Sequence, residues 1–285
     1  MTNKHKEKYK ALLHLLKSFN KVAIAFSGGV DSTFLVAAAR EALGENVVAY
    51  TVNSPYIPDW EITEAIEWAK QTGVEHEIIK TKIPDNIINN PLNRCYLCKK
   101  QIFTLLKSKA KKRNIKYLLE GTNKDDEGDY RPGMKALEEL EVISPLREVG
   151  LTKAEIRQLS KGLGLPTWDK PAYACLLTRI PYDITITPEE LIRIEKGEGY
   201  LFQLGFEGAR LRSHGNLARI ELQQEQFELM NDKNKKETIV KKLKAAGYQF
   251  ICIDLEGYRM GGRWGNGVMG ERKNGEMEKW SGDTH

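Results

Sequence analysis

The sequence predicts an α/β protein with a parallel-sheet domain over residues 1–170 and a smaller α+β domain over residues 171–260. Three observations lead to this prediction. Short β-rich segments alternate with helical segments through the first half, as in sheets whose parallel strands are joined by helices. A glycine-rich turn joins the first strand to the helix that follows it. In the second half, two strand-like segments flank the dipeptide Gly215-Asn216, which indicates an antiparallel hairpin.

The chain opens with an expected amphipathic helix. Its first twenty residues mix leucines with lysines, and they lack both the apolar core and the small-residue cleavage site of a signal peptide. No uninterrupted apolar run approaches the roughly 18 residues that a membrane span requires. Four cysteines without an export signal favour a metal or redox role over a disulfide framework. We therefore expect a soluble protein of the reducing cytoplasm, with no membrane partner.

The elements of the first domain follow in order. Strands are expected at residues 22–26, 47–52, 76–80 and 116–121. The helices between them begin near Asp31, after the second strand and after Arg94, and the last of these is long and basic. The polar stretch GTNKDDEGDYRPG, from Gly121, is expected to form a loop because it is rich in Gly, Asn and Asp. Thr152 and Glu155 have the spacing of a capping box, which predicts another helix from there.

The second domain has a different pattern. A helix is expected over TPEELIRIEKGEGYLFQLG, followed by the strands ARLRSH and LARIELQ, helical residues up to Ala246 and the apolar segment YQFICID. Residues 261–285 are rich in glycine and poor in aliphatic side chains, so their ordering entropy would go largely uncompensated. We expect this tail to be disordered.

The most informative segment is the hexapeptide SGGVDS at residues 27–32, which follows an apolar strand and precedes an apolar helix. Two glycines permit a tight turn, so that backbone N–H groups and the positive end of the helix converge on phosphate oxygens. The hydroxyls of Ser27 and Ser32 add donors. Asp31 would repel a phosphate, which assigns it to Mg²⁺ or to the amides of the loop itself. Simple turn chemistry is the alternative for any Gly-Gly pair between a strand and a helix.

This loop lacks the GK[ST] ending of the common phosphate-binding loop, so a different bond of ATP is expected to break. SGGVDS resembles the PP-loop of the N-type ATP pyrophosphatases, whose fold is adenine nucleotide alpha hydrolase-like. The resemblance implies that an acceptor oxygen attacks the α-phosphorus and that pyrophosphate leaves. It also implies contacts to ATP from Ala25, Ser27, Gly28, Gly29, Val30, Asp31, Ser32, Thr51, Gly121, Thr122 and Asn123.

Three cysteines form the second candidate site. Cys95 and Cys98 are separated by two residues, a spacing that lets both thiols face one metal, and Cys175 lies in PAYACLLTRIPYD. If the three converge, one position of a 4Fe-4S cluster stays open for chemistry. A thioredoxin-like redox pair is one alternative. A structural zinc site is another, but its fourth ligand would be Cys252, which an apolar strand is expected to bury as an inert thiol.

Further motifs extend the resemblance across nearly the whole chain up to about residue 260. SGGVDS, EGTNKDD, ISPLRE, PAYACLLTRIPY, ARLRSHGNLARIEL and DLEGYRMG together resemble the LarE family. Members are pyridinium-3,5-bisthiocarboxylic acid mononucleotide synthases, which adenylate the carboxylates of a pyridinium mononucleotide and install sulfur. Their product leads to the nickel-pincer cofactor of lactate racemase. The resemblance implies ATP, Mg²⁺, a sulfide or sulfur donor and often a homo-oligomer.

The family uses two sources of sulfur. Some members sacrifice the sulfur of one cysteine, which matches Cys175, and others carry two further cysteines and bind a cluster. Because Cys95 and Cys98 are both present, we expect Cys175 to be a cluster ligand, with the sacrificial reaction as the alternative. Cys175 and Asp31 are the expected catalytic residues. The resemblance implies substrate contacts from Thr178, Arg179, Glu198, Arg210, Arg212 and Arg259.

For the substrate residues, periodicity alone leaves alternatives open. Arg210 and Arg212 share one face of a strand, which suits an anion pocket or an exposed surface equally, and Glu198 lies in a charged helix where a solvated face is the default. Arg forks bind phosphates and carboxylates bidentately.

Two other functions remain as alternatives. A PP-loop tRNA thiolase also combines adenylation with three cysteines, but 44 basic against 39 acidic residues is a mild excess, and only KSKAKKR at 107–113 is concentrated. We therefore expect no nucleic-acid partner. A non-catalytic nucleotide or metal sensor is the second alternative, and it would bind ATP without releasing pyrophosphate.

Overall fold

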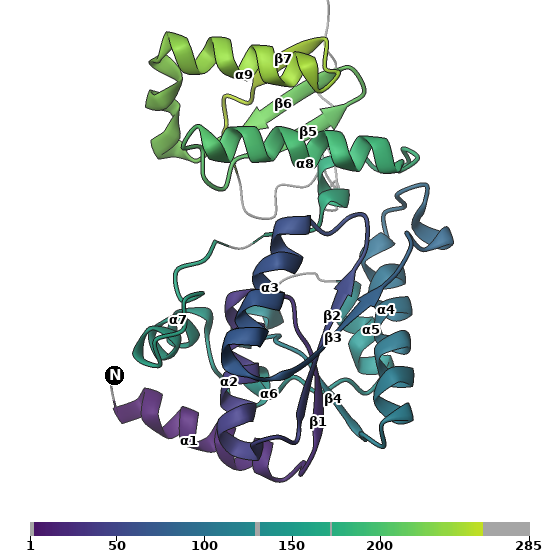
Figure 1. The fold of residues 1–285 in the computed structure, drawn as a ribbon, viewed down its shortest axis with the longest axis vertical. Coiled ribbons are helices and arrows are strands. Elements are labelled where there is room, and N and C mark those ends of the chain that lie inside the picture. Colours follow the sequence, from purple (N-terminus) through teal and green to yellow (C-terminus); the bar gives the residue numbers. More distant parts are fainter. Residues whose placement is uncertain (1–2, 129–131, 172, 259–285) are drawn as a thin grey trace, which may run out of the picture.

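A computed structural model describes residues 3–128, 132–171 and 173–258, and this part of the chain contains two sheets (Figure 1). The first sheet has four strands in the order β3-β2-β1-β4, and every neighbouring pair is parallel. The strands are β1 (Val22–Ala25), β2 (Val47–Asn53), β3 (Glu75–Lys80) and β4 (Tyr117–Leu119). The predicted α/β class with a parallel sheet is confirmed.

Helices cover both faces of this sheet, which explains why the inner strands β1 and β2 are apolar on both sides. Val22 and Ile24 point into one core cluster and Ala23 points into another, as the alternation of side chains along a strand requires. The first cluster includes residues of α1 (Asn3–Lys17), α2 (Val30–Leu43), α3 (Asp59–Thr72), α6 (Pro145–Glu148) and α7 (Lys153–Gly162). The second includes residues of α4 (Arg94–Lys112) and α5 (Pro132–Glu139).

The expected capping box is present at the start of α7. The Thr152 hydroxyl accepts a hydrogen bond from the Glu155 amide at 3.3 Å, and the Glu155 carboxylate accepts one from the Thr152 amide at 2.9 Å. The polar stretch after Gly121 is less irregular than expected, because Lys124–Gly128 forms a 3-10 turn, η2, and α5 follows at Pro132.

The second sheet has the order β5-β6-β7, with β5 (Arg210–His214), β6 (Leu217–Glu221) and β7 (Phe250–Ile253). The predicted hairpin is confirmed: β5 and β6 are antiparallel, and Gly215 in the turn has a φ of 64°. β7 pairs with β6 in parallel, which the sequence analysis did not foresee. The helices α8 (Pro188–Gln203) and α9 (Lys233–Ala245) contribute to the core of this unit.

The connection between the two units brings one segment close to the first sheet. The 3-10 turn η3 (Leu176–Arg179) packs in the same core cluster as Tyr56, which follows β2, and Ile87, in η1 (Asp85–Ile87). The Leu176 amide donates to the Tyr56 carbonyl at 2.9 Å. The remaining 3-10 segment, η4 (Gln224–Asn231), precedes α9. The domain boundary near residue 170 stays a prediction.

No helix in the described ranges is long and apolar enough to cross a bilayer. The expected disorder of residues 261–285 concerns a part of the chain that lies outside the described residues.

Candidate active site

The turn between β1 and α2 depends on glycine at two points. Gly28 has a φ of 69°, and a Cβ there would lie 3.2 Å from the Cβ of Ala65 on α3. Gly29 is the N-cap residue of α2, with no side chain to occupy the space in front of the helix. Because the first amides of a helix have no partner within it, they stay available to an anion in front of the turn.

The serines of the hexapeptide lie side by side in this turn. The hydroxyls of Ser27 and Ser32 are 3.1 Å apart, and the Ser32 hydroxyl also accepts from the Ser27 amide at 3.2 Å. The Ser27 hydroxyl accepts from the Gly29 amide at 3.4 Å. Backbone amides and two hydroxyls therefore converge at the N-terminus of α2, the arrangement that binds phosphate.

A cavity of about 410 Å³ opens in front of this turn. Of the residues expected to bind ATP or to act in catalysis, those lining it are Ala25, Ser27, Gly29, Asp31, Ser32, Thr51, Gly121, Thr122 and Cys175. Gly28, Val30 and Asn123 are not among its lining residues. The cavity lies at the carboxyl ends of β1, β2 and β4, where open α/β sheets bind their ligands.

Asp31 carries a polar atom without a hydrogen-bond partner. Its carboxylate forms an ion pair with Lys153 through Oδ2, whereas Oδ1 is buried and makes no hydrogen bond within the described structure. Burial raises the pKa of Asp31, and the Lys153 ammonium partly opposes that rise. Asp126 lines the same cavity. Mg²⁺ is commonly held by one or two carboxylates together with substrate phosphates, so these two residues fit a nucleotide-bound Mg²⁺.

Glu120 organises the loop after β4. Its carboxylate accepts hydrogen bonds from the Thr122 amide at 3.1 Å and the Thr122 hydroxyl at 2.7 Å, and a third from Ser144. At Gly121 a Cβ would lie 3.1 Å from the Ser32 amide nitrogen, so glycine permits this loop to approach α2. Gly121 and Thr122 are thus held against the hexapeptide.

Thr51 has a structural role as well as a place in the cavity wall. Its hydroxyl donates to the Phe26 carbonyl at 2.7 Å, and the His76 Nε2 lies 2.8 Å from the same hydroxyl. The Thr51 side chain therefore fixes the backbone at the end of β1, next to the turn that carries Ser27.

The three candidate cysteines approach one another from two segments. Cys95 and Cys98 lie in the first turns of α4, and Cys175 is the residue before η3. The Cys98 thiol lies 3.2 Å from the Tyr56 hydroxyl. The pKa of the Cys175 thiol is raised to about 11, mainly by burial and in smaller part by the Cys95 and Cys98 thiols.

This arrangement falls short of a coordination site. Over residues 3–128, 132–171 and 173–258, no three His, Cys, Asp or Glu side chains are positioned to hold a metal ion. The fourth cysteine, Cys252, is half-buried in β7, and burial raises the pKa of its thiol.

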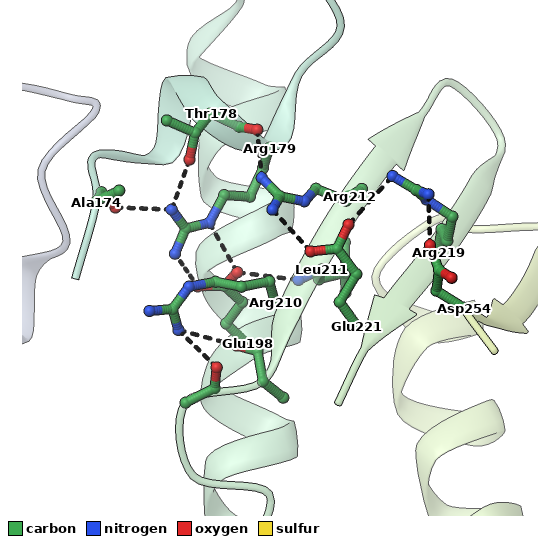
Figure 2. A network of polar contacts seen from close by, with 12 residues as sticks. Ala174, Thr178, Arg179, Glu198, Arg210, Leu211, Arg212, Arg219, Glu221 and Asp254 are labelled. Carbon is green, nitrogen blue, oxygen red and sulfur yellow. Dashed lines mark hydrogen bonds and ion pairs between the residues drawn. The ribbon is translucent and has the colours of Figure 1, made fainter. Parts of the chain in front are cut away.

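Figure 2 shows a network of arginines and carboxylates. It lies next to Cys175, because the Arg179 Nη1 donates to the Cys175 carbonyl at 3.2 Å. Arg179, which is 1% exposed, donates to both Glu198 oxygens, from Nε at 2.8 Å and from Nη2 at 3.0 Å. Its Nη1 donates to the Ala174 carbonyl at 2.7 Å and the Thr178 hydroxyl at 2.8 Å. Glu198 also accepts from the Leu211 amide at 2.9 Å. The expectation that Glu198 lies on a solvated helix face is therefore wrong, because its side chain pairs with the buried Arg179.

The two hairpin arginines are buried, so the exposed-surface alternative for them is wrong as well. Arg212 donates to the Thr178 carbonyl at 2.7 Å and to Glu221 at 2.7 Å. Arg210 donates to the carbonyl oxygens of Gly208 and Ala209, at 2.9 and 3.2 Å. Burial lowers the pKa of Arg210.

Partners within the protein therefore hold Arg179, Arg210 and Arg212 in place. The remaining expected contact, Arg259, lies outside the described residues.

The sequence analysis missed three lysines of the site and, besides Glu120 and Asp126, the carboxylate of Glu61. Lys153 pairs with Asp31, Lys170 donates to the Gly28 carbonyl at 3.0 Å, and Lys99 and Glu61 line the cavity. None belongs to the hexapeptide, and no local pattern distinguishes these residues from surface charges. Burial raises the pKa of Glu61 to about 7.

Comparisons with known proteins agree with this geometry. The family model described as asparagine synthase matches residues 9–122, which include the hexapeptide and the loop after β4. The chain is 40% identical over 256 residues to an uncharacterized protein of Synechocystis, covering 89% of this chain and 96% of that one. An uncharacterized protein of Methanocaldococcus jannaschii is 36% identical over 259 residues, covering 91% and 96%.

An enzyme matches over a similar share of the chain. The pyridinium-3,5-bisthiocarboxylic acid mononucleotide synthase of Lactiplantibacillus plantarum is 35% identical over 256 residues, covering 88% of this chain and 91% of that enzyme. The phosphate-binding turn, the cavity and this similarity agree. The chain belongs to the LarE family of ATP-using PP-loop enzymes.

Proposed function

We propose that this protein is an ATP-dependent sulfur transferase that adenylates the carboxylates of pyridinium-3,5-biscarboxylic acid mononucleotide and replaces oxygen by sulfur. Its product would serve the biosynthesis of the nickel-pincer cofactor of lactate racemase. One observation carries the proposal: the phosphate-binding turn and Cys175 line the same cavity. A thiol beside an adenylation site is what sulfur transfer to an activated carboxylate requires.

In this proposal the turn binds the pyrophosphate part of ATP. The amides at the N-terminus of α2 and the hydroxyls of Ser27 and Ser32 stabilise the negative charge that develops on pyrophosphate as it leaves. The substrate carboxylate oxygen attacks the α-phosphorus, the bond to pyrophosphate breaks, and an acyl adenylate forms. Asp31, with its unpartnered Oδ1, and Asp126 would hold Mg²⁺ on the phosphates and reduce their repulsion of the incoming carboxylate.

Sulfur then forms a bond to the acyl carbon, and AMP leaves with the original oxygen. Cys175 lies before η3, whose Arg179 faces the second unit, so the acyl group would sit between the turn and the arginine network. Arg179, Arg210 and Arg212 are the cations available there for the phosphate and the second carboxylate of the substrate.

The donor set fits an iron–sulfur cluster and does not fit Mg²⁺, which prefers oxygen ligands, whereas a structural zinc site would need a fourth protein ligand. Three thiols without a carboxylate ligand, from Cys95, Cys98 and Cys175, are the soft ligands that such clusters use. When bound, a 4Fe-4S cluster with three protein ligands would supply sulfide from its open position. The chain's part would be to bring the Cys95 and Cys98 thiols toward Cys175, which lines the cavity.

The sacrificial reaction is the second candidate, and a specific observation favours it. Cys175 lines the cavity, whereas Cys95 and Cys98 are not among its lining residues. In that reaction the Cys175 thiolate would attack the acyl carbon and displace AMP. Loss of the Cα proton with cleavage of the Cβ–Sγ bond would then leave a thiocarboxylate on the substrate and dehydroalanine at position 175.

The basic helix α4 argues against tRNA thiolation. Lys109 forms an ion pair with Glu77 at 2.7 Å, Arg113 with Glu75, and Lys107 with Glu141 at 3.7 Å. Paired cations release few counterions on binding a phosphate backbone, so the stretch at 107–113 makes a weak nucleic-acid surface.

Anaerobic purification with iron and sulfide analysis, followed by turnover and intact mass, tests the proposal. The cluster route predicts bound iron, repeated turnover, and loss of both in Cys95→Ser and Cys98→Ser but not in the control Cys252→Ser. Protein without iron that loses one sulfur from Cys175 per turnover supports the sacrificial route. ATP binding without pyrophosphate release in every condition supports the sensor and refutes both.

Two further expectations belong to this proposal. The protein forms a homo-oligomer, which the resemblance implies, and it acts in the reducing cytoplasm, which its four free cysteines favour. Size-exclusion chromatography with light scattering tests the first, and a monomeric mass at the concentrations used for turnover contradicts it.

A further inference from the structure

A second cavity, of about 280 Å³, lies between the N-terminal part of α3 and the second unit. Figure 1 shows α3 reaching from the first sheet toward α8, and the Asp59 amide at its start donates to Glu195 of α8 at 2.7 Å. The aromatic and charged residues that line the cavity are Trp60, Glu64, Tyr173, Glu198, Phe202, Phe206 and Arg210. Aromatic walls with a few charged groups are typical of small-molecule sites.

Two of these rings, Trp60 and Tyr173, meet nearly at a right angle and form one corner of the cavity. Trp60 and Tyr173 are in edge-to-face contact, with centroids 4.7 Å apart and an interplanar angle of 74°. They come from α3 and from the segment that leads to Cys175. The Trp60 side chain is nevertheless 37% exposed, so the contact leaves much of the indole open to a ligand.

The faces of both rings already attract cations. The Lys170 ammonium lies over the Trp60 ring, 5.3 Å from its centroid, and the Arg210 guanidinium lies over the Tyr173 ring at 5.0 Å. Lys170 also pairs with Glu64 at 2.6 Å. The corner therefore combines electron-rich rings with carboxylates, which attract a positive ring, and an arginine, which attracts its anionic substituents.

We propose that Trp60 and Tyr173 bind the ring of the substrate, a flat aromatic cation that carries carboxylates. The ring contacts the Trp60 and Tyr173 side chains, and Arg210 faces an anionic substituent. Glu64 and Glu198, which pair with Lys170 and Arg179, add negative charge at the wall of the cavity. This inference rests on the proposed function, because it takes the pyridinium class of the substrate from there.

Calorimetry with two probes separates the ring from the rest of the ligand. Nicotinic acid mononucleotide carries a pyridinium carboxylate and a ribose phosphate, and ribose 5-phosphate lacks the ring. Trp60→Leu should weaken nicotinic acid mononucleotide binding by roughly 5- to 30-fold and leave ribose 5-phosphate binding unchanged. Trp60→Phe should retain most of the affinity.

Trp168→Leu is the matched control, because Trp168 also lies under a lysine, with Lys161 at 4.2 Å, but does not line this cavity. It should bind both probes as the wild type does. Thermal denaturation of each variant separates a lost contact from a lost fold, and Trp60→Phe tests the ring if Trp60→Leu unfolds.

Three results overturn the inference: a wild type that does not bind nicotinic acid mononucleotide, a Trp60→Leu variant that binds it unchanged, and an equal loss of affinity for ribose 5-phosphate. Failure of the proposed function gives a different result. In that case the ring-dependent loss is seen, but the wild type neither releases pyrophosphate nor transfers sulfur with the dicarboxylate mononucleotide.

Discussion

Glu61 gives the sharpest test of the electrostatics of the nucleotide cavity. Burial raises its pKa from 4.5 to about 7, with Lys170 and Arg179 opposing the rise and Glu64 adding to it. The raised value lies about 2.5 pH units above 4.5, and at about 1.36 kcal/mol per unit this corresponds to roughly 3 kcal/mol. Ionised Glu61 therefore destabilises the folded protein, and Glu61→Gln removes that charge at every pH.

The direction in which stability changes with pH follows from where the folded and unfolded states bind the Glu61 proton. Because the pKa of Glu61 is higher in the folded state, the folded protein keeps the proton on Glu61 between pH 4.5 and about 7, where the unfolded protein has lost it. The stability that protonated Glu61 contributes is therefore complete below pH 4.5 and is lost as the pH rises through 7. Glu61→Gln should match the wild type near the acidic end and be more stable by up to roughly 3 kcal/mol at pH values above 7.

Urea denaturation of both proteins across this pH range measures the difference. Glu67→Gln, an exposed position on the same helix, is the matched control and should show a small difference that varies little with pH. A difference for Glu61→Gln that is constant with pH, or that grows toward acid, would refute the reasoning.

Three other predictions concern the phosphate-binding turn and the arginine network. Gly28→Ala should destabilise the protein by about 1–3 kcal/mol, and more than the control Gly44→Ala. Both positions have a positive φ, but of the two only Gly28 has a close neighbour for the new Cβ. Thermal denaturation compares the two variants. Lys153→Met should raise the pKa of Asp31 further, because it removes the ammonium that opposes the rise, and should move the pH midpoint of Mg²⁺-ATP binding upward in calorimetry. Glu198→Gln leaves a buried guanidinium without its counter-charge and should lower the free energy of unfolding by about 3 kcal/mol in urea.

The fold was predictable where the determinants are local. Strand and helix alternation, the capping box at Thr152 and the hairpin turn at Gly215 each depend on residues close together in the sequence. Strand order was not predictable in the same way: β4 pairs with β1, and β7 pairs with β6, across long connections. Those pairings depend on how helices pack on each sheet, which local patterns do not encode.

The candidate site, like the fold, could be predicted where its residues are close together in the sequence and not where they are far apart. The hexapeptide is contiguous, so its turn could be predicted from glycine conformation and helix geometry. Lys153 and Lys170 reach the turn from positions 122 and 142 residues away from their partners, and neither stands in a motif of its own. Glu198 shows most clearly what local sequence cannot predict. The charged pattern of its helix is typical of a solvent-exposed face, and the ion pair with Arg179 is evident only in the folded structure.

The central claim is that the phosphate-binding turn activates a pyridinium carboxylate for replacement of oxygen by sulfur. The most direct measurement follows pyrophosphate release and product mass with ATP and pyridinium-3,5-biscarboxylic acid mononucleotide under anaerobic conditions. We predict pyrophosphate release that depends on this substrate and a product whose mass reflects exchange of oxygen for sulfur. Pyrophosphate release that is independent of the substrate, or a substrate recovered with its mass unchanged, would contradict the claim.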